Sequence, residues 1–217
     1  MCGIVGLVES DLNRPASQSA LQRMVRTLVH RGPDEEGSIA LTGVGLAMRR
    51  LAIVDLAGGQ QPFTNETGDI HLVANGEIYN FPELRRELEL LGHTFRSRSD
   101  IEVLVHGYEQ WGPGFLPRMR GMFALALWDG RTRTLLAARD RAGEKPLYWS
   151  LTSNGLRLAS EVKALLVCPE VSRELDAEAL DQFLTYEYIL DPRIILKGGQ
   201  KLRPASYLAY RDGQVEV

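Results

Sequence analysis

The feature of the sequence that most constrains its fold is a set of short apolar runs joined in pairs by tight turns. Such pairs are typical of β-hairpins, so we expect antiparallel sheets. The run FALALW at 123–128 is apolar at every position, which predicts a sheet covered on both faces. The predicted hairpins are 39–41 with 44–48 around Thr42-Gly43, 123–128 with 134–138 around Asp129-Gly130, and 148–151 with 156–159 around Asn154-Gly155.

Helices are predicted between these hairpins, so the pattern as a whole indicates a layered α+β sandwich. The run at 70–74 leads into Asn75-Gly76, a dipeptide that tolerates positive φ. Ser99 and Glu102 have the spacing of a capping box that would open a helix through about 110. The other predicted helices are 21–28, 82–91 and 176–184, and the other predicted strands are 4–8, 70–74, 193–197 and 207–210.

Composition excludes several classes of protein. The 217 residues are 44% hydrophobic and 24% charged, as in ordinary globular domains, and the net charge of −3 argues against a nucleic-acid partner. The longest apolar run, 122–128, is too short to cross a membrane, and the start has no signal-peptide pattern. Two cysteines form no disulfide framework, and no Cys/His pair has metal-ligand spacing. We therefore expect a cytoplasmic protein without a membrane partner or a metal site.

The chemistry is concentrated at the beginning of the chain, where Cys2 follows the initiator Met1. Cysteine is small enough for methionine aminopeptidase to expose it. An N-terminal cysteine carries a thiol and an α-amine together, and the amine titrates at about 7.7–8.0. The amine can therefore act as the base for its own nucleophile, with no separate histidine. The structural alternative is that Cys2 is a small buried residue leading into a strand.

Three further positions suit acyl transfer on an amino-acid substrate. Asn75 and Gly76 can supply a side-chain amide and a backbone N–H to an oxyanion. Arg50 can grip a carboxylate with two hydrogen bonds, and Asp100 can hold an ammonium group. Each also has an ordinary explanation, since Asn-Gly is a common turn and an acid is favoured in the first turn of a helix.

The chain resembles the asparagine synthetase type of class II glutamine amidotransferase. The resemblance rests on motifs in the same order across nearly the whole chain, and the RGPD element is the most discriminating. They are MCGIVG at 1–6, HRGPDEEG at 30–37, RLAIVDL at 50–56, NGEIYN at 75–80, SDIEVL at 99–104, RGMFALALWD at 120–129, RDRAGEKPLY at 139–148 and SEVKAL at 160–165.

This resemblance implies a four-layer αββα N-terminal-nucleophile hydrolase sandwich with two mainly antiparallel sheets, which hydrolyses L-glutamine. The glutaminase domain would span 2–165, and 166–217 would be an extension completing it and leading toward a synthetase domain. Cys2 would be the nucleophile, with Asn75 and Gly76 as the oxyanion hole. The implied glutamine-binding residues are Arg50, Leu51, Ala52, Ile53, Val54, Asn75, Gly76, Glu77 and Asp100.

In such a family the ammonia is used by an ATP-dependent synthetase domain, with aspartate as the default acceptor. The SGGxD phosphate-binding loop of that domain does not occur in this sequence. No cofactor is therefore expected in this chain, and ATP and Mg are expected only in the synthetase domain. The chain would be a fragment, or the amidotransferase subunit of a split enzyme, and a homodimer stays open.

Three alternatives remain at this stage. If Met1 is retained, the amine is blocked and the domain would be an inert regulatory or scaffolding module. A Cys–His hydrolase would need one of His30, His71, His93 and His106 beside Cys2. A nucleic-acid interface would use the arginines Arg118, Arg120, Arg131, Arg133, Arg139 and Arg141.

Overall fold

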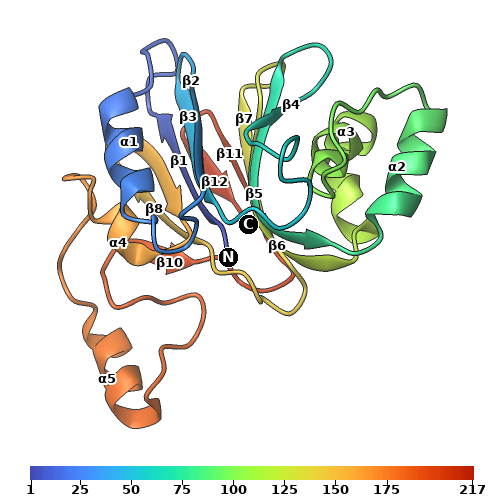
Figure 1. Ribbon diagram of the computed structural model, residues 1–217. Coiled ribbons are helices and arrows are strands. Elements are labelled where there is room, and N and C mark those ends of the chain that lie inside the picture. The colour runs from blue at the N-terminus through green and yellow to red at the C-terminus, as the bar shows by residue number, and fades with distance from the viewer.

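The computed structural model describes residues 1–217 and contains two six-stranded sheets that face each other (Figure 1). Every strand pair in both sheets is antiparallel. The first sheet has the order β10 (Gly199–Lys201), β8 (Tyr148–Thr152), β9 (Gly155–Ala159), β1 (Gly3–Glu9), β3 (Val44–Arg50) and β2 (Glu35–Ala40). The second has the order β12 (Gln214–Glu216), β11 (Tyr207–Arg211), β7 (Thr134–Arg139), β6 (Gly121–Asp129), β5 (Ile70–Ile78) and β4 (Phe63–Thr64).

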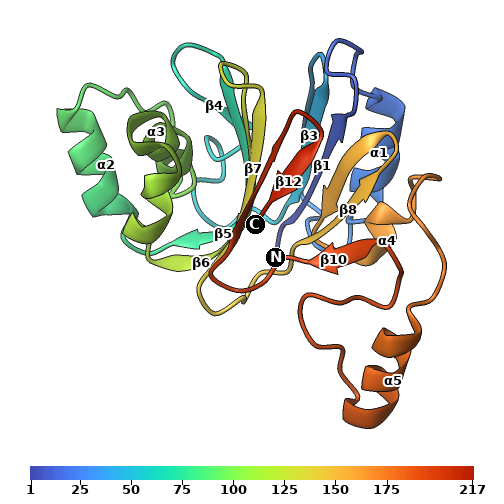
Figure 2. The ribbon, with the colours of Figure 1, turned by 180° about the vertical axis from the view of Figure 1, so that it is seen from behind.

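Helices cover the outer face of each sheet and complete four layers (Figures 1 and 2). The first sheet packs against α1 (Gln18–Arg26) and α4 (Val162–Leu165), and the second against α2 (Phe81–Leu90), α3 (Glu102–Trp111) and the 3-10 helix η1 (Gly112–Arg118). The α+β four-layer sandwich and the three hairpins are thereby confirmed. Helix α5 (Ala177–Tyr186) projects away from the layers (Figure 2). No helix is long and apolar enough to span a membrane.

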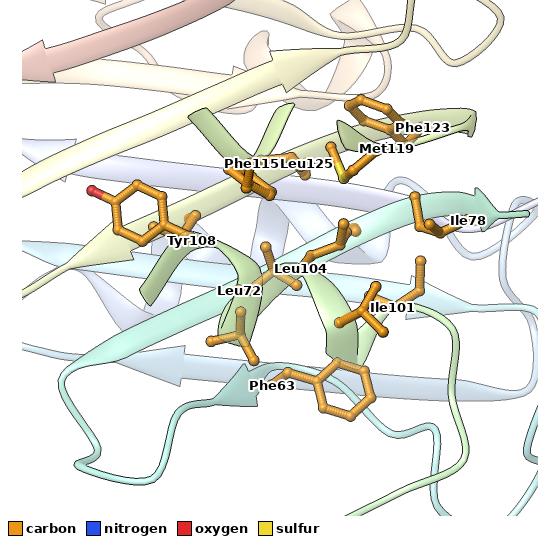
Figure 3. Close-up of a cluster of buried hydrophobic side chains, with 14 of the residues drawn as sticks. Phe63, Leu72, Ile78, Ile101, Leu104, Tyr108, Phe115, Met119, Phe123 and Leu125 are labelled. Atoms are coloured by element: carbon orange, nitrogen blue, oxygen red, sulfur yellow. The ribbon is translucent and has the colours of Figure 1, made fainter. Parts of the chain in front are cut away.

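Three apolar clusters fill the spaces between the layers. Along β6, Ala124 and Ala126 face the first sheet, whereas Leu125 and Leu127 face α2 and α3. Figure 3 shows the cluster between the second sheet and its helices, in which Leu125 lies with Phe115 and Leu104. Because both faces of β6 are buried, its run of apolar residues has no polar alternation.

Strand β5 is longer than the sequence predicts, and this changes the setting of Asn75 and Gly76. The strand continues to Ile78, with Asn75 opposite Ala124 and Gly76 opposite Phe123 on β6. Neither residue has positive φ, so the alternative explanation of Asn75-Gly76 as an ordinary turn is wrong. Glycine is required at 76 for another reason, since a Cβ there would overlap the Met122 carbonyl oxygen.

The capping box at Ser99 and Glu102 was also wrong. Helix α3 begins at Glu102 after Ile101, which has no side-chain cap. The Glu102 carboxylate instead accepts hydrogen bonds from the backbone N–H and hydroxyl of Ser97, at 2.8 and 2.5 Å. The residues before the helix are therefore an ordered loop, and Asp100 lies in that loop.

The C-terminal third of the chain contributes strands to both sheets. The predicted strand at 207–210 is confirmed as β11, which pairs with β7, and the predicted helix at 176–184 is confirmed as α5. The strand expected at 193–197 is reduced to an isolated antiparallel bridge between Leu196 and Leu175, with one backbone hydrogen bond on either side of it. The sheet gains β10 at 199–201 instead. Helix α1 ends at Arg26, earlier than the apolar spacing through Leu28 predicts.

Candidate active site

A pocket of about 690 Å³, counting its open mouth, lies between the start of β1 and the last residues of β5. It is lined by every residue that the sequence predicts for the site except Ala52, whose N–H donates to Asp34 Oδ2 at 2.9 Å instead. The predicted residues that line it are Cys2, Arg50, Leu51, Ile53, Val54, Asn75, Gly76, Glu77 and Asp100. Residues far apart in the sequence thus share one cavity.

Cys2 immediately precedes β1, and its backbone is held in place by Arg31, which is partly buried. The Cys2 carbonyl oxygen accepts a hydrogen bond from Arg31 Nε at 2.9 Å, and Arg31 Nη1 in turn pairs with Glu161 Oε1 at 2.9 Å. The Cys2 thiol points toward the Leu51 carbonyl oxygen, with an Sγ···O distance of 3.8 Å. Met1 also lines the pocket and is 60% exposed, so its removal would leave the α-amine of Cys2 at the pocket mouth.

The free edge of β5 forms one wall of the pocket, because β4 pairs with only two residues of β5. At Ala74, both backbone groups along this edge are bonded to the side chain of Gln61, at 2.6 and 3.1 Å. At Ile78, the N–H donates to Asp100 Oδ2 at 2.8 Å. Alternate residues of a strand direct their backbone groups to the same edge, so Gly76 directs its N–H between these two anchored positions.

The register with β6 supports this orientation of Gly76. Phe123, its partner on β6, directs both its N–H and its carbonyl toward Asp140. The pair formed by Gly76 and Phe123 is therefore a non-hydrogen-bonded pair, and the Gly76 N–H points away from β6. It is a backbone donor on an open strand edge beside the pocket.

Asn75 supplies a second donor on the adjacent residue. Its side chain lies on the same face of β5 as Val73, which packs between the two sheets, and it is only 2% exposed. The Asn75 Nδ2 atom is buried and has no hydrogen-bond partner. A buried amide without a partner costs about 1–3 kcal/mol, so its presence in a polar pocket indicates a ligand oxygen as its acceptor.

Arg50 anchors the loop that forms the opposite wall. Its Nη1 pairs with Glu35 Oε2 at 2.7 Å, and its Nη2 donates to the carbonyl oxygens of Val54 and Asp55, each at 2.8 Å. Gly59 allows this close approach, since a Cβ there would overlap the guanidinium. The sequence predicts a carboxylate-binding arginine here, and the structure adds that Arg50 shapes the pocket loop.

The acidic side of the pocket is formed by Asp100 and Glu77. Burial raises the pKa of Asp100, and the negative charge of Glu77 adds to the increase, against the lowering effect of the Ile78 N–H. A cation placed between the two carboxylates would relieve this repulsion. The arrangement therefore suits a substrate ammonium group.

Sequence reasoning missed several residues that also line the pocket, namely Gly59, Gln61, Ser99, Ile101, Met122 and Lys145. Lys145 falls inside one of the motifs quoted above, and Ser99 is adjacent to Asp100, so their positions could have suggested them. Gln61 carries no such signal. Its role depends on the segment just before β4 lying beside β5, which is a tertiary contact.

No histidine lines the pocket, so the Cys–His alternative has no base. His30 pairs with Glu161 Oε1 at 2.9 Å, and His71 with Thr64 Oγ1 at 3.0 Å. A group of side chains that could hold a metal ion exists elsewhere, and none of its members contacts this pocket; they are Glu66, His93, His106 and Glu109.

The arginines considered for nucleic-acid binding are largely engaged within the domain. Arg139 is buried and donates to carbonyl oxygens, including those of Lys145 and Leu202 at 2.8 Å. Arg131 pairs with Asp129 at 3.0 Å, and Arg141 donates to the Met119 carbonyl oxygen at 3.0 Å. These contacts account for Arg131, Arg139 and Arg141 without a nucleic-acid partner.

The chain is similar in sequence to a known family and to several curated proteins. Residues 1–217 match the family described as glutamine amidotransferase domain. Asparagine synthetase [glutamine-hydrolyzing] 1 of Bacillus subtilis (strain 168) is 38% identical over 218 residues, which cover 99% of this chain and 34% of that protein. Asparagine synthetase [glutamine-hydrolyzing] 2 of the same organism is 42% identical over 180 residues, covering 81% of this chain and 24% of that protein. The chain thus spans about a quarter to a third of the length of these curated relatives.

A solved structure shows the same fold at low sequence identity. Glutamine phosphoribosylpyrophosphate amidotransferase from B. subtilis, complexed with ADP and GMP, matches with a TM-score of 0.70 and 18% identity, covering 99% of this chain and 48% of that chain. This likeness concerns the fold, whereas the family match and the relatives concern the sequence itself. Together with the pocket that joins Cys2 to Asn75 and Gly76, they show that the chain belongs to the class II glutamine amidotransferase family, a family of enzymes.

Proposed function

We propose that this chain, once Met1 is removed, hydrolyses L-glutamine to glutamate and ammonia through a thioester on Cys2. The observation that carries the proposal is the buried Asn75 amide without a partner, beside the Gly76 N–H, in the pocket that Cys2 lines. A tetrahedral oxyanion needs hydrogen-bond donors of this kind, and the amide and the N–H come from adjacent residues. The family match supports the choice of glutamine as the substrate.

The proposed reaction has two steps. The α-amine of Cys2 takes the thiol proton, and the thiolate attacks the side-chain carbonyl carbon of glutamine to give a tetrahedral oxyanion. Asn75 Nδ2 and the Gly76 N–H hold this oxyanion. The C–N bond then breaks and the α-ammonium protonates the leaving nitrogen. Ammonia departs, and a thioester between Cys2 and the glutamyl group remains. Water, activated by the same amine, attacks the thioester and releases glutamate with a free thiol.

The pocket also suits the two charged ends of glutamine. The α-ammonium fits beside Asp100 and Glu77, where a positive charge relieves the repulsion between two carboxylates. We place the α-carboxylate of glutamine beside Arg50. There the guanidinium can give up a hydrogen bond to a loop carbonyl oxygen and donate to the charged carboxylate instead. Leu51, Ile53 and Val54 would enclose the aliphatic part of the substrate.

The longer relatives indicate where the ammonia goes. They are described as asparagine synthetases, and this chain covers about a third of their length. We therefore propose that the ammonia serves ATP-dependent amidation, with aspartate as the acceptor, in a synthetase domain or partner subunit that would hold ATP and Mg. Helix α5 exposes Leu180, Phe183 and Leu184, an apolar surface that such a domain can cover.

The proposal is tested by labelling with 6-diazo-5-oxo-L-norleucine, an electrophilic glutamine analogue, and by measuring ammonia release. The adduct should map to Cys2 by mass spectrometry, and Cys2→Ser should abolish both labelling and activity. Cys168→Ser is the matched control, because Cys168 is buried away from the pocket and should not affect either. An adduct at Cys168, or a Cys2→Ser protein as active as wild type, would contradict the proposal.

The inert-module alternative is tested in the same preparations. Intact-mass measurement separates protein with Met1 from protein that begins at Cys2. We expect ammonia release only from the processed form, since a peptide bond removes the basic amine. Equal activity in both forms would show that the amine is not the base.

A further inference from the structure

A cluster of four potential metal ligands lies outside the glutamine pocket. Glu66 comes from the turn between β4 and β5, His93 follows α2, and His106 and Glu109 lie three residues apart on α3. Residues at this spacing share one face of a helix. The ligand atoms of all four lie within 4.8 Å of one another.

His106 is the buried member of the cluster. It is 1% exposed, and neither ring nitrogen makes a hydrogen bond. Its Nδ1 lies 3.1 Å from Glu66 Oε2, but the approach does not meet hydrogen-bond geometry. Glu109 Oε2 is likewise buried without a hydrogen-bond partner. Buried polar atoms are normally satisfied, so two such residues directed at one point indicate a missing ligand.

The far side of each imidazole ring faces a side-chain oxygen, at hydrogen-bond distance for His93 and farther away for His106. His93 Nε2 lies 3.1 Å from Gln110 Oε1, which leaves Nδ1 facing Glu66 and Glu109, at 3.3 and 3.8 Å. On His106, Nε2 faces the Glu102 carboxylate at 3.7 Å and Nδ1 faces the cluster. Histidines that bind metal are typically oriented in this way by a carbonyl or carboxylate behind the ring.

The carboxylates are held in the same manner. Glu109 Oε1 accepts a hydrogen bond from Asn65 Nδ2 at 2.9 Å, so its other oxygen is left for the cluster. Glu66 Oε1 accepts the Thr94 N–H at 2.8 Å, and its Oε2 is the oxygen near His106. His93, Glu66 and Glu109 therefore each have one atom fixed by a hydrogen bond and another directed toward the cluster.

We propose that Glu66, His93, His106 and Glu109 bind a divalent transition-metal ion of the zinc class. Two imidazole nitrogens and two carboxylate oxygens match the ligands and the coordination number of zinc, whereas Mg²⁺ and Ca²⁺ prefer oxygen alone. Four protein ligands close the coordination sphere, so the site is structural. The sequence predicts no metal site because His93 and His106 are thirteen positions apart, without a ligand motif.

The position of the site gives the metal a mechanical role. It would join the turn before β5 to the loop between α2 and α3 and to α3 itself. Strand β5 carries Asn75 and Gly76, and Asp100 lies just before α3. A bound ion would therefore stiffen two of the elements that carry the pocket, without taking part in its chemistry.

The test uses the full chain stripped of metal with a chelator, and the probe is Zn²⁺ itself. At free zinc about 100-fold above Kd, we expect the melting temperature to rise by about 5–10 °C. Mg²⁺ should give no rise. His93→Gln and Glu109→Gln should lose the zinc-dependent rise, and His30→Gln, which removes a surface imidazole outside the cluster, should keep it.

Cobalt(II) supplies an independent readout that does not depend on the variants folding or on glutaminase activity. Added to wild-type protein, it should give the absorption of a tetrahedral nitrogen–oxygen site without thiolate charge transfer, and Cys2→Ser should not change it. The proposal is overturned if folded wild type shows neither a zinc-dependent shift nor this spectrum. It is also overturned if folded His93→Gln binds as wild type does, or if binding requires Cys2.

Discussion

Replacing Asn75 with alanine tests the oxyanion hole most directly. Asn75 is 2% exposed, so in the proposed reaction its amide would act where water is largely excluded and a donor is most effective. Removing one such donor costs about 2.7–4 kcal/mol of transition-state stabilisation, or about 10²–10³ in kcat. The Gly76 N–H remains, so activity should not fall to the level of a Cys2 variant. KM should change little, because the oxyanion exists only after attack.

The same substitution should leave folding nearly unaffected, which separates it from a structural lesion. The Asn75 amide nitrogen has no partner to lose, and removing a buried unpaired amide favours the fold by about 1–3 kcal/mol. The small void left behind costs a similar amount. The net change should stay within about 1 kcal/mol, or about 2–4 °C in Tm.

The assay is ammonia release from processed protein at saturating glutamine, with Tm measured on the same samples. Asn154→Ala is the matched control, since Asn154 lies exposed in the turn between β8 and β9 and should retain wild-type kcat. If Asn75→Ala keeps kcat within threefold of wild type while remaining folded, Asn75 does not hold the oxyanion and the reasoning fails.

Three further substitutions test other parts of the site. Asp100→Asn should raise KM for glutamine about 10- to 100-fold, from the loss of a charged partner for the ammonium, and an unchanged KM would remove Asp100 from that role. Because the pKa of Asp100 is raised in the fold, the stability of the wild-type protein should fall as the pH rises through that pKa. Measurements of Tm against pH should show that Asp100→Asn lacks this dependence and is more stable than wild type near neutral pH. Burial acts to raise the pKa of Glu161, but hydrogen bonds from Arg31, His30 and Lys163 lower it to about 2. The ionised carboxylate therefore stabilises the fold at pH values above its usual pKa of 4.5, and this stabilisation is lost as the pH falls toward 2. Glu161→Gln should lower stability at pH 7 by about 1 kcal/mol after solvent screening and should flatten the acid limb of the Tm profile; an acid limb identical to wild type would contradict this account. Gly76→Ala should destabilise by about 1–3 kcal/mol in urea unfolding, because its Cβ meets the β6 backbone, whereas Gly114→Ala has open space and should be neutral; equal stability of the two would refute the close approach.

Local patterns were sufficient for most of the fold. Hairpins depend on apolar runs and on the turn between them, and these are neighbours in sequence, so all three predicted hairpins are present. The continuous apolar run of β6 correctly indicated burial on both faces. The errors occurred where a tertiary contact outweighed a local preference. Asn75-Gly76 stays extended because β6 pairs with it, and Glu102 turns to Ser97 instead of capping its own helix.

The sequence by itself determined the chemistry that this chain offers: a cysteine that removal of Met1 would make N-terminal, an Asn-Gly pair, and charged residues suited to the two ends of an amino acid. Its motifs also sufficed to indicate the family. These features are identities and short spacings, which the order of residues encodes directly. The roles of individual residues are the part that biochemistry must now test.

Only the tertiary structure decided how these residues meet and which of their atoms are available. It brought Gln61 to the edge of β5, left the Asn75 amide without a partner, and committed Arg50 to the pocket loop. It also brought His93 and His106 together beside two carboxylates. Contacts of this kind depend on how separate sheets and helices pack, and no local spacing in the chain records that packing.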